Sequence, residues 1–152
     1  MGKSFTPLTL LHDHPGYQCL VCIDANEPEA VVVRWLNQQP AETIWITSIT
    51  LFEARLGLSL LADGRRRRTL EAALIRVLEE DLANRVLSFD SDAALHTAML
   101  AAGRQKAGRP VDIRDTLIAG IVLANHATLA TRNLKHFEGI SAVNPWDCTD
   151  IP

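Results

Sequence analysis

The sequence feature that most constrains the fold is a helical pattern followed at once by a strand pattern, in residues 111–133 (VDIRDTLIAGIVLANHATLATRN). Apolar residues recur there at the spacing of one buried helix face. They are Leu117, Ile118, Ile121 and Val122. We expect this helix to end near Asn125 and His126. Residues 127–131 (ATLAT) have strand composition and are expected to form a strand directly after it.

Polar side chains mark the outer ends of this helix and strand. Asp115 lies where the helix begins, and Arg132 and Asn133 follow the strand. A carboxylate at a helix start beside a strand end is a common way to build a site in an α/β domain. From this segment alone, the simpler interpretation of Asp115 is a helix cap. Only other segments of the sequence can show whether Asp115 belongs to a functional site or caps the helix.

Strand and helix patterns alternate along the chain. Strands are expected at residues 19–23, 43–48, 86–89 and 141–144, the last of them at the sheet edge. Helices are expected from a cap at Asn26 to Pro40, and at residues 49–61, 65–82 and 92–107. Parallel strands need crossovers, and helices are the usual crossovers. The pattern therefore predicts an α/β fold, a single three-layer α/β/α domain with a central, mainly parallel sheet.

Composition places the chain among ordinary globular proteins. Its 152 residues suffice for one domain with its own core, and 47% of them are hydrophobic and 22% charged. No apolar run is long enough for a membrane span and the first residues lack a signal-peptide pattern, so we expect a cytoplasmic protein without a membrane partner. The net charge of -3 gives no global attraction to nucleic acid. The three cysteines make neither a disulfide framework nor a complete zinc set.

Two carboxylates and one amide are the candidate site residues. Glu53 lies five residues after the strand expected at 43–48, and Asp115 and Asn133 border the strand expected at 127–131. Because the carboxyl ends of parallel strands share one edge of a sheet, we expect these three residues in one crevice. Clustered oxygen ligands without His or Cys favour Mg²⁺ or Mn²⁺ over zinc. No glycine-rich phosphate loop or hydrolase elbow motif supports nucleotide binding or a catalytic triad.

Four segments in order carry a resemblance to a known family. They are residues 47–57 (TSITLFEARLG), 115–121 (DTLIAGI), 129–139 (LATRNLKHFEG) and 144–146 (NPW). The chain resembles the VapC and FitB-like toxins of the PIN-domain ribonuclease family, from about Pro28 to Trp146. The resemblance implies a PIN-like domain at residues 28–146, between an irregular segment at 1–27 and a short tail at 147–152.

The resemblance also implies a metal site. In that family a first Asp follows the first strand in an Asp-Thr-Asn motif, and a Glu, a second Asp and a weaker polar position complete the site. Glu53 matches the Glu, Asp115 the second Asp, and Asn133 the last position. A neutral Asn there lowers the negative charge around the metal without removing an oxygen ligand.

The first Asp of the family is where this sequence departs. Counting back from Pro28 without gaps places the Asp-Thr-Asn motif on residues 16–18 (GYQ), which cannot do the same chemistry. One hypothesis is a frameshift: codons for residues 12–24 (HDHPGYQCLVCID), read one nucleotide later, can spell Met-Ile-Ile-Leu-Asp-Thr-Asn-Val-Leu-Ser-Ala-Leu. The other is that residues 20–23 replace the first strand and Asp24 serves as the first ligand, although few residues separate Asp24 from the helix at Pro28.

The function that the resemblance implies is metal-dependent hydrolysis of RNA phosphodiester bonds by a toxin. Such toxins pair with a small antitoxin whose tail fills the active-site groove, and they tend to form homodimers. Four basic residues near the expected crevice are candidates for contacts with the RNA backbone: Arg132, Lys135, Arg114 and Arg109. Two alternatives remain open at this point. One is a PIN scaffold that binds antitoxin or RNA without cleavage, and the other is a small α/β regulatory domain in which Asp115 is a structural cap.

Overall fold

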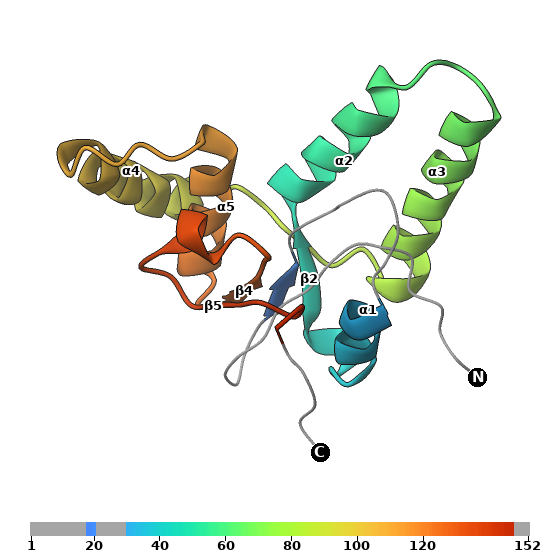
Figure 1. Ribbon diagram of the computed structural model, residues 1–152, viewed down its shortest axis with the longest axis horizontal. Helices are drawn as coiled ribbons and strands as arrows, with labels where there is room; N and C mark the ends of the chain where they lie inside the picture. The colour runs from blue at the N-terminus through green and yellow to red at the C-terminus, as the bar shows by residue number, and fades with distance from the viewer. Residues whose placement is uncertain (1–17, 21–29, 148–152) are drawn as a thin grey trace.

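A five-stranded, wholly parallel sheet forms the centre of the computed structural model, which describes residues 18–20 and 30–147 (Figure 1). The strand order is β3-β2-β1-β4-β5. The strands are β1 (Gln18–Leu20), β2 (Ile44–Thr47), β3 (Val86–Leu87), β4 (Thr128–Ala130) and β5 (Ala142–Val143). Each pair of neighbours is parallel, which confirms the α/β fold predicted from the alternation of strands and helices.

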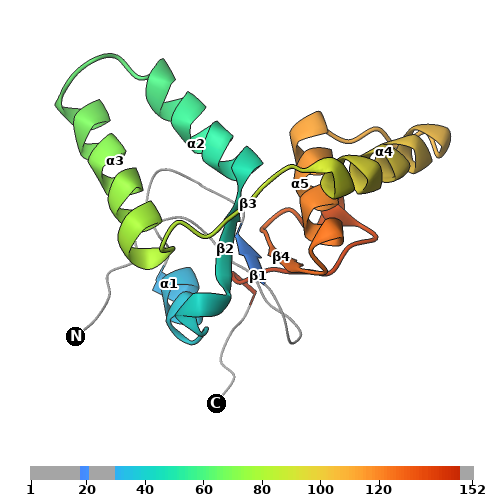
Figure 2. The ribbon, with the colours of Figure 1, turned by 180° about the vertical axis from the view of Figure 1, so that it is seen from behind.

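The helices connect these strands. They are α1 (Ala30–Asn37), α2 (Ser48–Leu60), α3 (Arg65–Arg76), α4 (Ser91–Lys106) and α5 (Ile113–Ala124). Three short turns complete the described elements: η1 (Ala41–Thr43), η2 (Val77–Asp81) and η3 (Leu134–Phe137). Helices α2 and α3 form one arm that rises from the sheet, and α4 lies beside α5 in a second arm (Figures 1 and 2). None of the helices in the described part of the chain has the length and apolar character needed to span a membrane.

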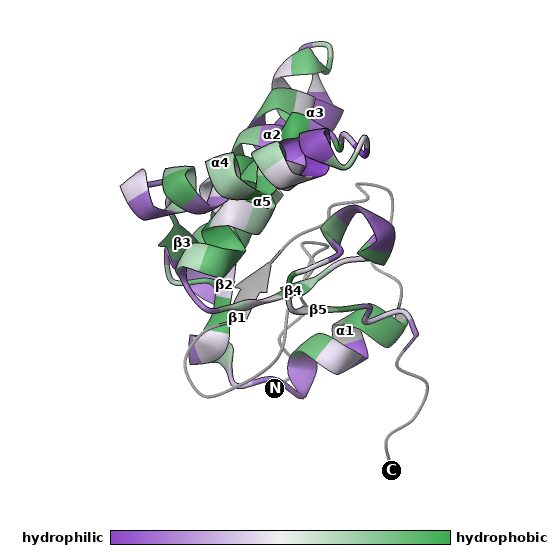
Figure 3. Ribbon diagram, turned by 90° about the vertical axis from the view of Figure 1, so that its left-hand side faces the viewer, coloured by the Kyte–Doolittle hydropathy of each residue, from purple (hydrophilic) through white to green (hydrophobic). Residues whose placement is uncertain are grey.

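Helix α5 lies against the sheet through the apolar face that the sequence predicts. Ile118, Ile121 and Val122 are almost fully buried, as is Leu129 of the following strand. The hydropathy colouring in Figure 3 shows green bands on α5, and purple at the start of α3, where the four consecutive arginines lie. This close packing holds the first turn of α5 in a fixed place relative to the sheet.

The long helix predicted at residues 65–82 is divided in the structure. Regular α3 ends at Arg76, and residues 77–81 form a π-helical turn in which the Leu82 N–H donates to the Val77 carbonyl oxygen (2.9 Å). The wider turn places two residues that are five apart on one face, and both Val77 and Leu82 are buried in the core. Burial of this pair therefore overrides the 3.6-residue period at the end of the helix.

Strand β1 occupies the central position of the sheet. Its last residue, Leu20, is aligned with Ile46 of β2 and Ala130 of β4. Residues 19 and 20 of the strand predicted at 19–23 are in β1, and residues 21–23 lie outside the described part of the chain. Thr47 and Thr131 follow the aligned residues, so the carboxyl ends of all three strands open onto the edge of the sheet that carries α2 and η3.

Candidate active site

Glu53 is held by a helix that begins directly at the end of β2. The Thr47 side chain caps α2 by accepting a hydrogen bond from the Thr50 N–H (3.0 Å), and the two threonine hydroxyls are 2.8 Å apart. Both threonines are buried. This rigid junction places Glu53 in the second turn of α2, where its side chain is half-buried, with 35% of its surface exposed.

Asp115 lies in the first turn of α5 but does not cap it. The cap is Asp112, whose Oδ1 accepts a hydrogen bond from the Arg114 N–H (2.9 Å). The interpretation of Asp115 as a helix cap is therefore wrong. An Asp-x-x-Asp spacing at a helix start is a signal that would have assigned the cap to Asp112. The Asp115 carboxylate, 25% exposed, is left for other interactions.

In the structure Glu53 and Asp115, two of the three residues expected in one crevice, lie near enough for their charges to repel. Burial is the largest cause of a raised pKa at Glu53, and repulsion from Asp115 and Asp112 raises it further. The Arg114 guanidinium opposes this shift, with its Nη1 3.6 Å from Glu53 Oε1. One cation thus lies beside these carboxylates and counters their repulsion, so burial is what keeps the pKa of Glu53 raised.

The segment after β4 packs against the first turn of α5. His136 Nδ1 is 2.9 Å from Asp115 Oδ2, which joins η3 to the candidate site. Asn133 stands just before η3, where its backbone N–H donates to Thr131 Oγ1 (3.1 Å), and the residue is exposed. Sequence patterns assigned His136 no role, because no spacing rule connects positions that meet only through the fold.

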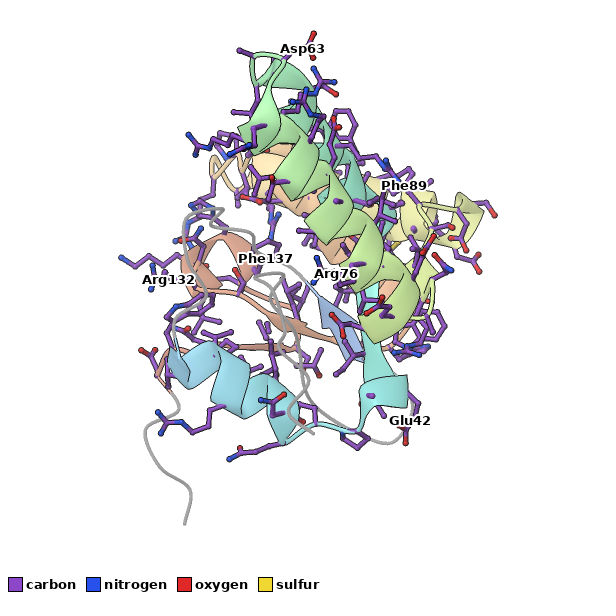
Figure 4. All side chains as sticks on the ribbon, turned by 90° about the vertical axis from the view of Figure 1, so that its right-hand side faces the viewer. Glu42, Asp63, Arg76, Phe89, Arg132 and Phe137 are labelled. Atoms are coloured by element: carbon purple, nitrogen blue, oxygen red, sulfur yellow. The ribbon has the colours of Figure 1, made fainter. Side chains whose placement is uncertain are left out.

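The basic residues proposed for RNA contacts lie in different surroundings. The Arg132 guanidinium stacks over the Trp146 ring, 4.6 Å from its centroid, and points away from the body of the molecule in Figure 4. Arg114 pairs with Glu53 within the site. Lys135 in η3 and Arg109 between α4 and α5 are exposed. Arg114 is thus an ion-pair partner of a candidate site carboxylate.

The donor chemistry fits a hard divalent cation in part. Glu53 and Asp115 supply carboxylate oxygens, which Mg²⁺ and Mn²⁺ prefer. Within residues 18–20 and 30–147, however, no group of three or more His, Cys, Asp or Glu side chains is arranged to hold a metal ion. The remaining carboxylate candidate, Asp24, lies outside the described residues.

The fold and this pair of carboxylates define a class of protein that the comparisons identify. The family model of the PIN domain matches residues 20–141, and the chain belongs to that family. Among its relatives is the plasmid stability protein StbB of Pseudomonas syringae pv. tomato, 41% identical over 123 residues, which are 80% of this chain and 88% of StbB. The VapC ribonuclease Y4jK of Sinorhizobium fredii is 35% identical over the same shares of the two chains.

Solved structures agree with this assignment. A structure of FitAB bound to a DNA fragment superposes with a TM-score of 0.73 at 28% sequence identity, covering 82% of this chain and 89% of that one. The toxin FitB of Neisseria gonorrhoeae is itself 30% identical over 122 residues, 79% of this chain and 88% of FitB. The resemblance to VapC and FitB-like toxins seen in the sequence is therefore confirmed.

The raised pKa of Glu53 predicts that Glu53→Gln changes the stability of the metal-free protein in a pH-dependent way. With a folded-state pKa above the unfolded value, Glu53 stabilises the fold in its protonated form. That contribution is fully present below pH 4.5 and is lost as the pH rises through the folded pKa. Glutamine stays neutral, so Glu53→Gln should melt above the parent protein at about pH 7 and level with it near pH 4.

Thermal melts in EDTA across this range measure the difference, which solvent screening of the partly exposed side chain keeps small. A lower melting temperature for Glu53→Gln at neutral pH would mean that the Arg114 ion pair outweighs burial and carboxylate repulsion.

Proposed function

We propose that this protein is a metal-dependent endoribonuclease and the toxin of a toxin–antitoxin pair. The observation that carries the proposal is the approach of Glu53 and Asp115 in a PIN domain. Relatives with 30% identity or more are named as a ribonuclease and as a toxin. Clustered carboxylates that repel one another are destabilised without a cation, which is the usual electrostatic signature of a metal site.

The proposed roles follow from the positions of the side chains. Glu53 and Asp115 hold Mg²⁺ or Mn²⁺, and Asn133 adds an amide oxygen at the edge of the site. When bound there, the cation supplies activation of water and neutralises charge on the phosphate oxygens. Lys135 and Arg109, both exposed, and Arg132 bind the RNA backbone. Arg114 balances the charge of Glu53 while the cation is absent.

Asp24 is our proposal for the first ligand of the chain as written. The register of β1 supports it, because Leu20 is level with the residues that precede Thr47 and Thr131, and Asp24 follows four residues later. The matched region of the family model begins at residue 20, in the same reading frame. The frameshift hypothesis requires instead that a different segment forms the first strand.

Ribonuclease assays on Asp24→Asn separate these two hypotheses. If Asp24 is the first ligand, the parent protein cleaves RNA with Mn²⁺ and the variant loses this activity. If the frameshift hypothesis holds, the parent is inactive. Replacing residues 12–24 by Met-Ile-Ile-Leu-Asp-Thr-Asn-Val-Leu-Ser-Ala-Leu then restores cleavage and toxicity. The codons for residues 12–28 test the frameshift reading directly, since they either permit it or forbid it.

The partner that we propose is a cognate antitoxin, with a homodimer as the assembly of the toxin. Related structures are described as complexes of FitAB and of VapBC from Salmonella typhimurium, both bound to DNA. Expression of the protein should arrest growth, and co-expression of its cognate antitoxin should relieve the arrest. Relief without any ribonuclease activity in the purified protein would favour the alternative of a PIN scaffold that binds and does not cleave.

A further inference from the structure

The hydrogen bond between His136 and Asp115 joins two elements that are distant in sequence. His136 Nδ1 lies 2.9 Å from Asp115 Oδ2. An ionised carboxylate has no proton to donate, so the imidazole must donate through Nδ1–H. This occupies one carboxylate oxygen and leaves the other available.

Arg104 fixes the position of His136 from a third element. It lies in the last turn of α4, where its Nη2 donates to the His136 carbonyl oxygen (2.9 Å) and its Nη1 to Thr116 Oγ1 (3.2 Å). The guanidinium therefore ties η3 to the first turn of α5, one residue from Asp115. Burial is the main cause of the lowered pKa of Arg104, and the negative charges of Asp115 and Glu138 oppose the shift. A cation is thus kept in a partly desolvated place within the electrostatic reach of Asp115.

We propose that Arg104 and His136 are positioning residues that orient the Asp115 carboxylate for a divalent cation. The inference rests on the proposed function. Arg114 directly precedes Asp115, and its guanidinium pairs with Glu53. If the Asp115 side chain rotated freely, its carboxylate could turn toward this guanidinium. The bond from His136 holds Oδ2 on the η3 side and keeps the carboxylate in one rotamer. Groups that orient a ligand in this way contribute about 10–100-fold to metal affinity.

A metal-free measurement tests the geometry. Long-range ¹H–¹⁵N correlation spectra of the imidazoles, recorded at about pH 8.5 where an ordinary histidine is neutral, distinguish the two tautomers. We expect His136 as the Nδ1–H tautomer in the parent protein. In Asp115→Ala it should shift toward Nε2–H, as it should to a smaller extent in Arg104→Met. His96, on α4, serves as the internal control and should stay unchanged in all three proteins. An Nε2–H tautomer for His136 in the parent protein would overturn the inference.

Mn²⁺ titration by calorimetry tests the consequence. His136→Phe and Arg104→Met should each weaken Mn²⁺ binding by about 10-fold or more, whereas His136→Asn, which can still donate to Asp115, should restore most of it. His96→Phe should bind Mn²⁺ like the parent. Unchanged affinity in His136→Phe, alongside lost binding in Asp115→Asn, would refute the positioning role and leave the proposed function intact. If the parent and Asp115→Asn bind Mn²⁺ equally poorly, the proposed function fails, and the tautomer spectra alone decide whether the network is formed.

Discussion

Replacing Asp115 by asparagine is expected to abolish Mn²⁺ binding and RNA cleavage while leaving thermal stability almost unchanged. Groups that only orient a ligand contribute about 10–100-fold to metal affinity, so loss of a ligand itself should weaken binding by more than about 100-fold. Stability should change by no more than about 1 kcal/mol. Loss of a carboxylate from the first turn of α5 costs a few tenths of a kcal/mol, and relief of the repulsion with Glu53 offsets it. Calorimetric titration, ribonuclease assay and thermal melts in EDTA measure the three quantities.

Two variants make this result specific. Asp92→Asn removes an exposed carboxylate from the first turn of α4 and should leave both metal binding and cleavage unchanged. Asp112→Ala removes the cap of α5 and should lower stability by about 0.5–2 kcal/mol, the usual cost of a lost N-cap. If Asp115→Asn instead lowers stability as much as Asp112→Ala does, Asp115 has a structural role and its assignment as a ligand is wrong.

Replacing Gly120 by alanine should cause a large loss of stability, because α4 lies directly against α5 at this glycine. A Cβ added at Gly120 would collide with Thr97 Oγ1 and lie 2.8 Å from the carbonyl oxygen of Ala93, both on α4. Rotation of Thr97 relieves the first contact, but the second is with backbone and requires α4 to move. Overpacking of this kind costs about 1–3 kcal/mol or more, which exceeds the gain of about 0.5–1 kcal/mol from a better helix former.

Each kcal/mol corresponds to about 2–4 °C in Tm for a protein of this size, so Gly120→Ala should melt several degrees below the parent. Gly103→Ala is the matched control. Gly103 lies in α4 with no heavy atom within 4 Å of an added Cβ, and the change should leave Tm the same or slightly higher. Equal melting of the two variants would show that α4 and α5 separate readily at Gly120. Metal affinity in Gly120→Ala should also fall, because Arg104 on α4 contacts Thr116 on α5.

Local sequence patterns were sufficient for most of the elements. The apolar positions of α5 and the β-branched composition of β2 predicted these elements to within one or two residues, since helix and strand periodicity follow from backbone geometry and burial alone. Parallel pairing followed from the alternation of elements. The helix predicted at residues 65–82 has the expected extent, but its last turn, residues 77–81, is π-helical, with Val77 and Leu82 both buried in the core.

The candidate site, like the fold, was predictable from the sequence only in part. The sequence by itself determined that Glu53 follows a strand end and that Asp115 begins the helix leading into the strand at 127–131, and hence that both belong at one edge of a parallel sheet. Only the tertiary structure decided what surrounds them, because side-chain contacts depend on strand order and on how closely helices approach. Asp112, and not Asp115, caps α5. Arg132 stacks on the Trp146 ring. His136 reaches Asp115 from 21 positions away because η3, which follows β4, packs against α5, a contact that no local period encodes.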